Sequence, residues 1–237
     1  METKKLKKKA RQKLTGKYIT TIAALLIYSL IGGLFVGTSK LIYNENMYIF
    51  FNIIITGLLY MGLLQIFIKV ARGKKTSVKD LFSRTDLFWK CTAITIVLTV
   101  FSTICIALEY IAYKSLAVFI LYQPDMSLAI CASMTILGVV ICAAIATFYV
   151  VMMASFSQVY YILYENENMP VTEIFEKSMD LMEKHKIDYI LFQLSFLLWI
   201  ILGLFTFGLL YLWLIPYMGV AEVNFYDEIK KLEKKQK

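Results

Sequence analysis

Residues 126–164, MSLAICASMTILGVVICAAIATFYVVMMASFSQVYYILY, form a run of 39 positions without a charged side chain. As one helix this run would be about 58 Å long, roughly twice the thickness of the hydrocarbon layer of a membrane. We therefore expect Met126–Tyr164 to cross a membrane and to tilt, bend or emerge from it as an interfacial helix. Such a helix would carry the tyrosines at the end of the run, Tyr160, Tyr161 and Tyr164.

Apolar segments on both sides of this run predict five further crossings. Apolar residues make up 59% of the 237 positions, above the roughly 45–50% of soluble domains. Backbone amides in hydrocarbon need hydrogen-bond partners within the protein, which helices and closed barrels provide. The strict alternation of apolar and polar residues that is typical of a barrel strand is not seen in this sequence, so we expect helices. The predicted fold class is all-α, a polytopic transmembrane helical bundle of six spans with amphipathic interfacial helices. The five other spans are Tyr18–Val36, Tyr48–Val70, Cys91–Ala112, Tyr189–Phe205 and Leu209–Tyr226.

Two local signals refine the last pair of spans. Thr206-Phe207-Gly208 predicts a tight turn between them. Pro216 lies within the sixth span and predicts a kink, because proline lacks an amide hydrogen.

Positive charges alternate with the six spans. Of the 25 Lys and Arg residues, 23 fall in the N-terminal tail, residues 69–90, residues 165–188 and the C-terminal tail. Lys40 and Lys114 are the two exceptions. Since cytoplasmic loops are rich in Lys and Arg, we expect a multi-pass protein of the cell (cytoplasmic) membrane with both termini in the cytoplasm. The 165–188 loop is the weakest link, because it holds seven acids and three basic residues.

The N-terminal segment has its own pattern. Leu6, Ala10 and Leu14 recur at helical spacing among eight basic residues, so we expect a short amphipathic helix on the inner leaflet. The apolar run that follows is interpreted as an uncleaved anchor. The predicted division of the chain is a basic amphipathic segment, a membrane domain and a basic cytoplasmic tail, at 1–17, 18–226 and 227–237.

Two predicted cytoplasmic loops resemble each other. Residues 78–85, VKDLFSRT, align with residues 171–178, VTEIFEKS. Interfacial helices are expected near Ser77–Phe82 and at Pro170–Lys184, the second with an apolar arc opposite an acidic one. One hypothesis is a duplication, in which spans two and three repeat as spans four and five. The alternative is that two short helices converged on one pattern.

Small residues suggest how the spans pack. Gly138, Cys142 and Ala146 share one face of span four, which predicts a central position for it in the bundle. Gly33 and Gly37 form a Gly-x-x-x-Gly pattern, and whether it packs within the chain or in a dimer is left open. The four cysteines all fall in predicted spans and are interpreted as apolar packing residues.

No catalytic, metal-binding or cofactor-binding motif is found in the sequence, and the single histidine, His185, has no neighbours at ligand spacing. The candidate intramembrane polar site comprises Glu222, Gln158 and Gln193, since polar groups inside a membrane are costly and often functional. Glu222 has two interpretations. It is either a carboxylate reached by water near the interface or an interior carboxylate that meets a substrate or a proton.

The net charge of +8 is interpreted as attraction to anionic lipid of the inner leaflet rather than to nucleic acid. A homo-oligomer or a partner in a membrane complex is also considered. The candidate anionic-lipid contacts are Lys7, Lys8, Arg11, Lys74 and Lys75.

Several stretches are also similar to one known family. They are residues 6–16 (LKKKARQKLTG), residues 155–161 (SFSQVYY), Ser178, Met182, His185-Lys186, residues 192–199, Phe207-Gly208, Pro216-Tyr217 and Phe225-Tyr226. In these the chain resembles an uncharacterised, Firmicutes-type family of bacterial multi-pass integral membrane proteins, a domain of unknown function. The resemblance implies a fold and no activity. Residues 41–145 resemble the family only in hydrophobicity, and Lys184 stands where the family often has glycine.

We therefore expect a non-enzymatic accessory or lipid-interacting membrane protein, with a role in envelope homeostasis or antimicrobial-peptide tolerance. The alternative is a small transporter or channel with an intramembrane polar site around Glu222. A membrane enzyme ranks third, because no set of polar groups obviously converges on a substrate.

Overall fold

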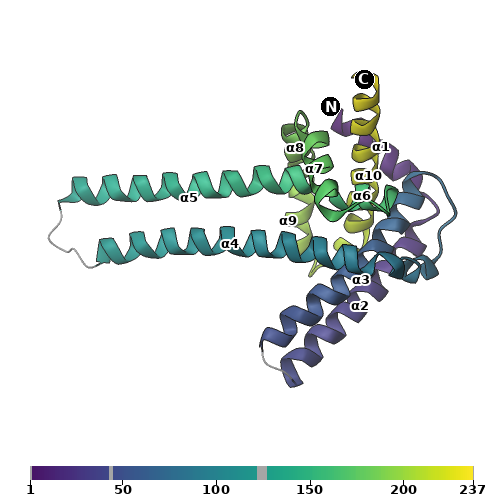
Figure 1. The fold of residues 1–237 in the computed structure, drawn as a ribbon, viewed down its shortest axis with the longest axis horizontal. Coiled ribbons are helices and arrows are strands. Elements are labelled where there is room, and N and C mark those ends of the chain that lie inside the picture. The colour runs from purple at the N-terminus through teal and green to yellow at the C-terminus, as the bar shows by residue number, and fades with distance from the viewer. Residues whose placement is uncertain (1, 43–44, 122–126, 237) are drawn as a thin grey trace.

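The structure is a computed structural model and describes residues 2–42, 45–121 and 127–236. Side chains within them are described except at 35–42, 45–56, 58, 119–121, 128 and 236. Every regular element in these ranges is helical, which confirms the all-α prediction (Figure 1). The elements are α1 Thr3–Leu14, α2 Tyr18–Ile42, α3 Glu45–Ala71, η1 Val78–Phe82, η2 Thr85–Leu87, α4 Phe88–Leu121, α5 Leu128–Phe156, α6 Val159–Glu165, α7 Val171–Met182, α8 Lys186–Leu194, α9 Leu197–Phe205 and α10 Tyr211–Gln236.

Helix α1 is the predicted amphipathic N-terminal helix, but its apolar face does not meet lipid. Its axis and that of α2 differ by 93°, and Gly16, at φ +79°, lies in the turn between them. Leu6, Ala10 and Leu14 are buried, and α1 packs on α10 and α3. Neighbouring helices of the same chain therefore cover this face. The prediction that the helix lies on the inner leaflet stays a prediction.

The long uncharged run does break, as its length requires. Helix α5 ends at Phe156 and α6 begins at Val159, with a turn at Ser157–Gln158. Helix α6 carries the three tyrosines of the sequence pattern, and Tyr161 is buried while Tyr160 and Tyr164 are partly exposed.

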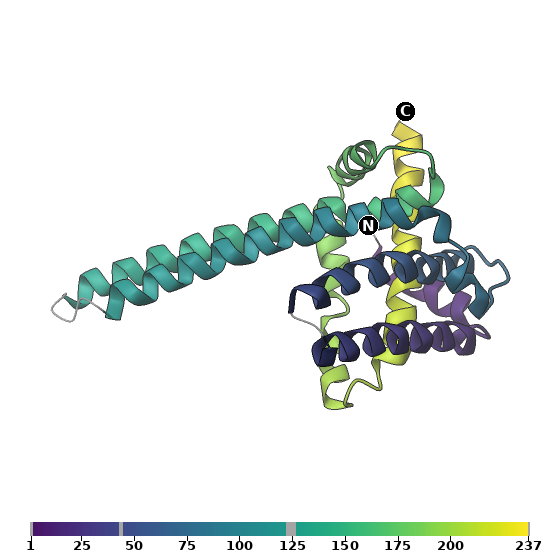
Figure 2. The same cartoon turned by 60° about the horizontal axis from the view of Figure 1, so that its bottom comes forward.

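Helices α4 and α5 form a long hairpin that projects from the other helices (Figures 1 and 2). The small residues of α5 face α4, and a methyl group added at Gly138 would lie 2.4 Å from Leu116 Cδ2. The rest of α5 is largely exposed, so the prediction that this span is central is wrong. The small-residue face serves one close partner and not a whole bundle.

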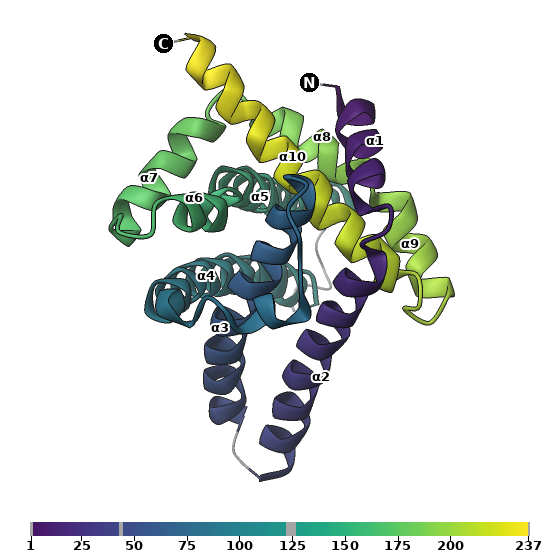
Figure 3. The same cartoon turned by 90° about the vertical axis from the view of Figure 1, so that its right-hand side faces the viewer.

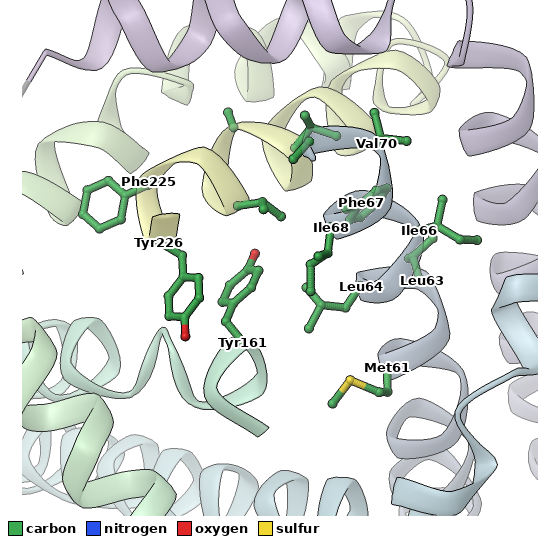
Figure 4. Packing of buried hydrophobic residues seen from close by; sticks show 14 of the residues in the cluster. Met61, Leu63, Leu64, Ile66, Phe67, Ile68, Val70, Tyr161, Phe225 and Tyr226 are labelled. Atoms are coloured by element: carbon green, nitrogen blue, oxygen red, sulfur yellow. The ribbon is translucent and has the colours of Figure 1, made fainter. Parts of the chain in front are cut away.

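Helix α10 occupies the central position instead, and packs on α1, α2, α3, α7 and α9 (Figure 3). It follows the predicted turn, in which Phe207 and Gly208 adopt positive φ angles of 50° and 84°. Pro216 lies inside the helix, as predicted. Close packing on α3 occurs at Gly219, where a methyl group would lie 2.3 Å from Phe67 Cδ2. Figure 4 shows side chains of α3 facing α10, with the ring of Tyr161 between the two helices.

Three helical segments of the described residues are long and apolar enough to cross a membrane. They are Val78–Val118, Ala129–Glu165 and Lys186–Phe205. A fourth is counted if the bent pair of α1 and residues 18–34 is taken as one span. The predicted second span is helical throughout, but the side chains of residues 45–56 lie outside the described set. The predicted sixth span, in α10, is not among these segments, and α10 packs on several neighbouring helices.

The two loops with similar sequences both form helices where the sequence predicts them. Residues 78–82 form a short 3-10 helix with a capping box at Ser77, and residues 171–182 form a longer α-helix that begins after Pro170. Leu81 and Ile174 occupy equivalent positions in the two motifs, and both are buried. This shared packing is compatible with a duplication and equally with convergence.

Three of the four basic segments of the sequence meet in space. The Arg72 guanidinium binds Glu165 at 2.7 Å and Asp227 at 2.9 Å, which joins the 69–90 segment, the 165–188 segment and the C-terminal tail. Lys230 also pairs with Glu165. Burial lowers the pKa of Arg72, but its hydrogen bonds to the two carboxylates outweigh burial and raise that pKa overall. Acids of the 165–188 loop thus neutralise basic groups of the neighbouring segments.

A second pair of contacts extends this network. The Arg84 guanidinium binds Glu167 at 2.5 Å, and Lys90 donates to the carbonyl oxygens of Glu167 at 2.6 Å and of Met169 at 3.0 Å. These contacts hold the start of α4 against the loop before α7. The loops that the charge pattern assigns to one side of the membrane therefore lie together.

Gly62 offers a test of the packing between α3 and η1. A methyl group at Gly62 would lie 1.8 Å from the carbonyl oxygen of Leu81, so Gly62→Ala should force η1 away and cost about 1–3 kcal/mol. Gly32→Ala in α2 is the control, since no atom of the described residues lies within 4 Å of its added methyl group. We expect thermal unfolding in detergent at a lower temperature for the first variant alone. Equal melting temperatures would contradict this packing.

Arg72→Gln tests the network between the basic segments. Loss of the shared guanidinium leaves Glu165 and Asp227 without their common partner, and should cost about 1–2 kcal/mol in this partly exposed setting. We expect faster amide hydrogen exchange in the last turns of α10. The control is Lys75→Gln, which removes an exposed charge from the same loop and should leave that exchange unchanged.

Candidate functional site

The candidate site is built around Glu222, on the central helix α10. Its flanking residues Ala221 and Val223 are fully buried, Glu222 itself is partly exposed, and its carboxylate contacts side chains of α6 and α8. Removing an ionisable carboxyl group from water is unfavourable unless other groups donate hydrogen bonds to it.

Three donors reach the Glu222 carboxylate. Tyr189 on α8 donates its hydroxyl to Oε1 at 2.9 Å, and Gln193, one turn later, donates its amide to the same oxygen. Tyr161 on α6 donates to Oε2 at 3.3 Å. Gln193 also donates to the Tyr189 hydroxyl at 2.8 Å, which fixes that hydroxyl as a donor to the carboxylate. The site is therefore a connected network across three helices.

The network opens into a cavity of about 470 Å³, within the usual range for small-molecule sites. Residues from α3, α4, α5, α6, α8 and α10 line it. The lining contains one carboxylate, five tyrosines and no Lys, Arg or His. The tyrosines are Tyr60, Tyr149, Tyr160, Tyr161 and Tyr189.

Three of these tyrosines make aromatic contacts of their own. Tyr160 and Tyr60 make an edge-to-face pair with ring centroids 4.8 Å apart, and the Tyr160 hydroxyl lies 2.8 Å from Thr95 Oγ1 on α4. Tyr161 stacks on Tyr226 at 5.3 Å. The aromatic walls are thus packed against the protein before any ligand arrives.

Two of the three predicted polar residues lie together in the structure. Glu222 and Gln193 meet, as the grouping of the candidate site requires. Gln158 does not join them, because it is buried in the turn between α5 and α6 and donates to Ser157 Oγ at 2.8 Å. Its Oε1 atom has no hydrogen-bond partner among the described residues.

The five predicted lipid contacts lie in different parts of the structure. Lys7 and Arg11 line a second cavity, between α1 and the helices α9 and α10. Lys8 is exposed on α1 outside that cavity, and Lys74 and Lys75 are exposed in the loop after α3.

The sequence analysis assigns no tyrosine to the polar site and places Tyr160 and Tyr161 on an interfacial helix. One signal in the sequence nevertheless points to the site. Tyr189 and Gln193 are four residues apart and therefore share a face of α8. Tyr60, Tyr149 and Tyr161 lie on three other helices, and only the fold brings them to Glu222.

Among the described side chains, no group of three or more His, Cys, Asp or Glu gathers closely enough to hold a metal ion. His185 lies 3.4 Å from Asp188, at the start of α8 and away from the cavity lining.

Comparison with known proteins supplies a family and no activity. A family model described as "Protein of unknown function (DUF975)" matches residues 1–233. No curated protein and no solved structure matches the chain. The sequence resemblance to a domain of unknown function is thereby confirmed over nearly the whole chain.

Tyr189→Phe tests the network directly. The variant removes a donor to Glu222 and an acceptor for Gln193, and should cost about 1–3 kcal/mol. Tyr149→Phe is the matched control, because it lines the same cavity and its hydroxyl is 3.5 Å from Ser102 Oγ. We expect a clearly lower melting temperature in detergent for Tyr189→Phe than for Tyr149→Phe. Identical values would show that the Glu222 network does not stabilise the fold.

Proposed function

Since the chain belongs to the family described as Protein of unknown function (DUF975), and that description names no activity, we propose its function from the geometry of the Glu222 cavity. The protein is a multi-pass membrane protein that binds a small organic cation in this cavity. The single observation that carries the proposal is one carboxylate among five tyrosines, without a basic side chain in the lining.

The lining fits a cation in two ways. A carboxylate in a low-dielectric site attracts a positive charge more strongly than one in water. Tyrosine ring faces attract ammonium groups, and aromatic cages recognise quaternary ammonium compounds in this way. An anion would find no basic side chain among the described residues of this lining, and the Glu222 carboxylate would repel it.

The existing hydrogen bonds leave room for such a ligand. Two donors converge on Oε1 of Glu222, whereas Oε2 receives a single hydroxyl at 3.3 Å, a long distance for such a bond. A cation beside Oε2 therefore need not break the shorter contacts. This arrangement favours the interpretation of Glu222 as an interior carboxylate that meets a substrate.

The membrane setting is part of the proposal. Six spans, with the termini on the cytoplasmic side, place the basic segments together, and the contacts of Arg72 and Arg84 support that grouping. The long hairpin of α4 and α5 supports it as well, since its exposed apolar residues suit a lipid environment.

The proposed activity is non-enzymatic binding or passage of the cation, which develops the transporter alternative. The accessory, lipid-interacting role in envelope homeostasis or antimicrobial-peptide tolerance is the second candidate. The cavity that contains Lys7 and Arg11 is the observation that favours it.

Choline and its neutral isostere 3,3-dimethylbutan-1-ol test the proposal, since they share shape and differ in charge. We expect the purified protein in nanodiscs to bind choline or tetraethylammonium at least tenfold more tightly than the alcohol, by isothermal titration calorimetry. Glu222→Gln should weaken cation binding at least tenfold, about 1.4 kcal/mol, and leave alcohol binding unchanged.

Glu228→Gln is the matched control, on the same helix but outside the cavity lining, and should bind as the unmodified protein does. The proposal fails if neither cation binds, or if Glu222→Gln binds both cations with unchanged affinity. Uptake of labelled choline into liposomes then separates a transporter from a protein that only binds.

A further inference from the structure

A second cavity, of about 350 Å³, lies where α1 meets α2, α9 and α10. It has no residue in common with the Glu222 cavity. Two cations and no carboxylate belong to its lining, together with four aromatic side chains and two leucines. The lining residues are Lys7, Arg11, Tyr18, Trp199, Leu210, Trp213, Leu214 and Tyr217.

The two cations are held differently. The Lys7 ammonium donates to the carbonyl oxygen of Ser195 at 2.7 Å and lies 3.7 Å from the centre of the Phe196 ring. Burial lowers the pKa of Lys7, so an anion in the cavity would stabilise its charged form. Arg11 forms no ion pair with any described acidic side chain, which leaves its planar guanidinium available to an oxyanion.

The remaining walls are apolar and open to the surroundings. Trp199 is 47% exposed and Trp213 is 53% exposed, although both line the cavity. Tryptophan and tyrosine with this exposure favour the boundary between lipid headgroups and hydrocarbon. The lining of the cavity therefore combines two basic side chains that can bind an anion with aromatic and leucine side chains that suit an apolar ligand.

The bend after α1 sets the direction of the helix that carries Lys7 and Arg11. Because α1 is at 93° to α2, it runs along the membrane surface if α2 crosses the membrane. Lys7 and Arg11 then belong to a helix that runs along the membrane surface, and Trp199 and Trp213 belong to α9 and α10.

We propose that this cavity is a binding site for one anionic phospholipid. Arg11 and Lys7 bind the headgroup phosphate, and the acyl chains lie against the two tryptophans. The basic face of α1 is thereby used for one defined lipid, in addition to a general attraction between charges. The site does not depend on the Glu222 cavity or its ligand.

Tryptophan fluorescence gives a direct test. In a Trp89→Phe background the remaining tryptophans are Trp199 and Trp213, so quenching by phospholipid with brominated acyl chains reports lipid in this cavity. The protein is purified in mild detergent and titrated with brominated phosphatidylglycerol or brominated phosphatidylcholine. We expect brominated phosphatidylglycerol to reach half-maximal quenching at a concentration at least fivefold lower than brominated phosphatidylcholine does.

Single charge removals test the assignment of residues. Arg11→Gln and Lys7→Gln should each reduce the preference for phosphatidylglycerol at least threefold, while quenching by phosphatidylcholine persists and shows that the cavity is intact. Lys8→Gln is the matched control, since it removes the same charge from the same helix outside the cavity.

Three results would overturn the proposal. They are equal quenching by the two lipids, an equal loss of preference in Lys8→Gln, and displacement of phosphatidylglycerol by millimolar inorganic phosphate, which would assign the site to free phosphate. Choline binding at Glu222 should be unchanged in Arg11→Gln, so failure here is distinguishable from failure of the proposed function.

Discussion

The Glu222 carboxylate ties the helices of this protein together, because a charged or polar carboxyl group in an apolar layer must find donors. Tyr189 and Gln193 on α8 and Tyr161 on α6 provide them. The same contacts fix the positions of α6 and α8 relative to the central helix α10, and the cavity forms where these helices meet α5. The interaction that makes the carboxylate tolerable is thus also the one that shapes the binding site.

Charge complementarity plays the same part at the polar end of the molecule. The seven acids in residues 165–188 look unfavourable for a cytoplasmic loop when counted alone. In the structure Glu165 and Glu167 bind Arg72 and Arg84 of the other long basic segment. Acids and bases that are distant in sequence therefore form one network, and the loop belongs with the basic segments.

Much of the helical pattern could be predicted from the sequence, since the length of an apolar run and the residues that form turns are local properties. The turn at Thr206-Phe207-Gly208 and the break within the long uncharged run are examples. The packing partners were not readable. Gly138 and its neighbours on α5 predict a close contact correctly but not its single partner, and Leu6 on α1 meets α10 rather than lipid. Apolar faces look the same whether protein or lipid covers them.

The sequence by itself determined that the chain is helical and apolar, where the turn at residues 206–208 lies, and that Glu222 is an unusual residue in its helix. Those features depend on residues within one or two helical turns. Only the tertiary structure decided that Gln193 meets Glu222 and Gln158 does not, that tyrosines from four helices besides α10 surround the carboxylate, and that Lys7 and Arg11 share a cavity with two tryptophans. Contacts between helices depend on how the helices cross and which faces they present, and spacing along the chain does not encode that geometry.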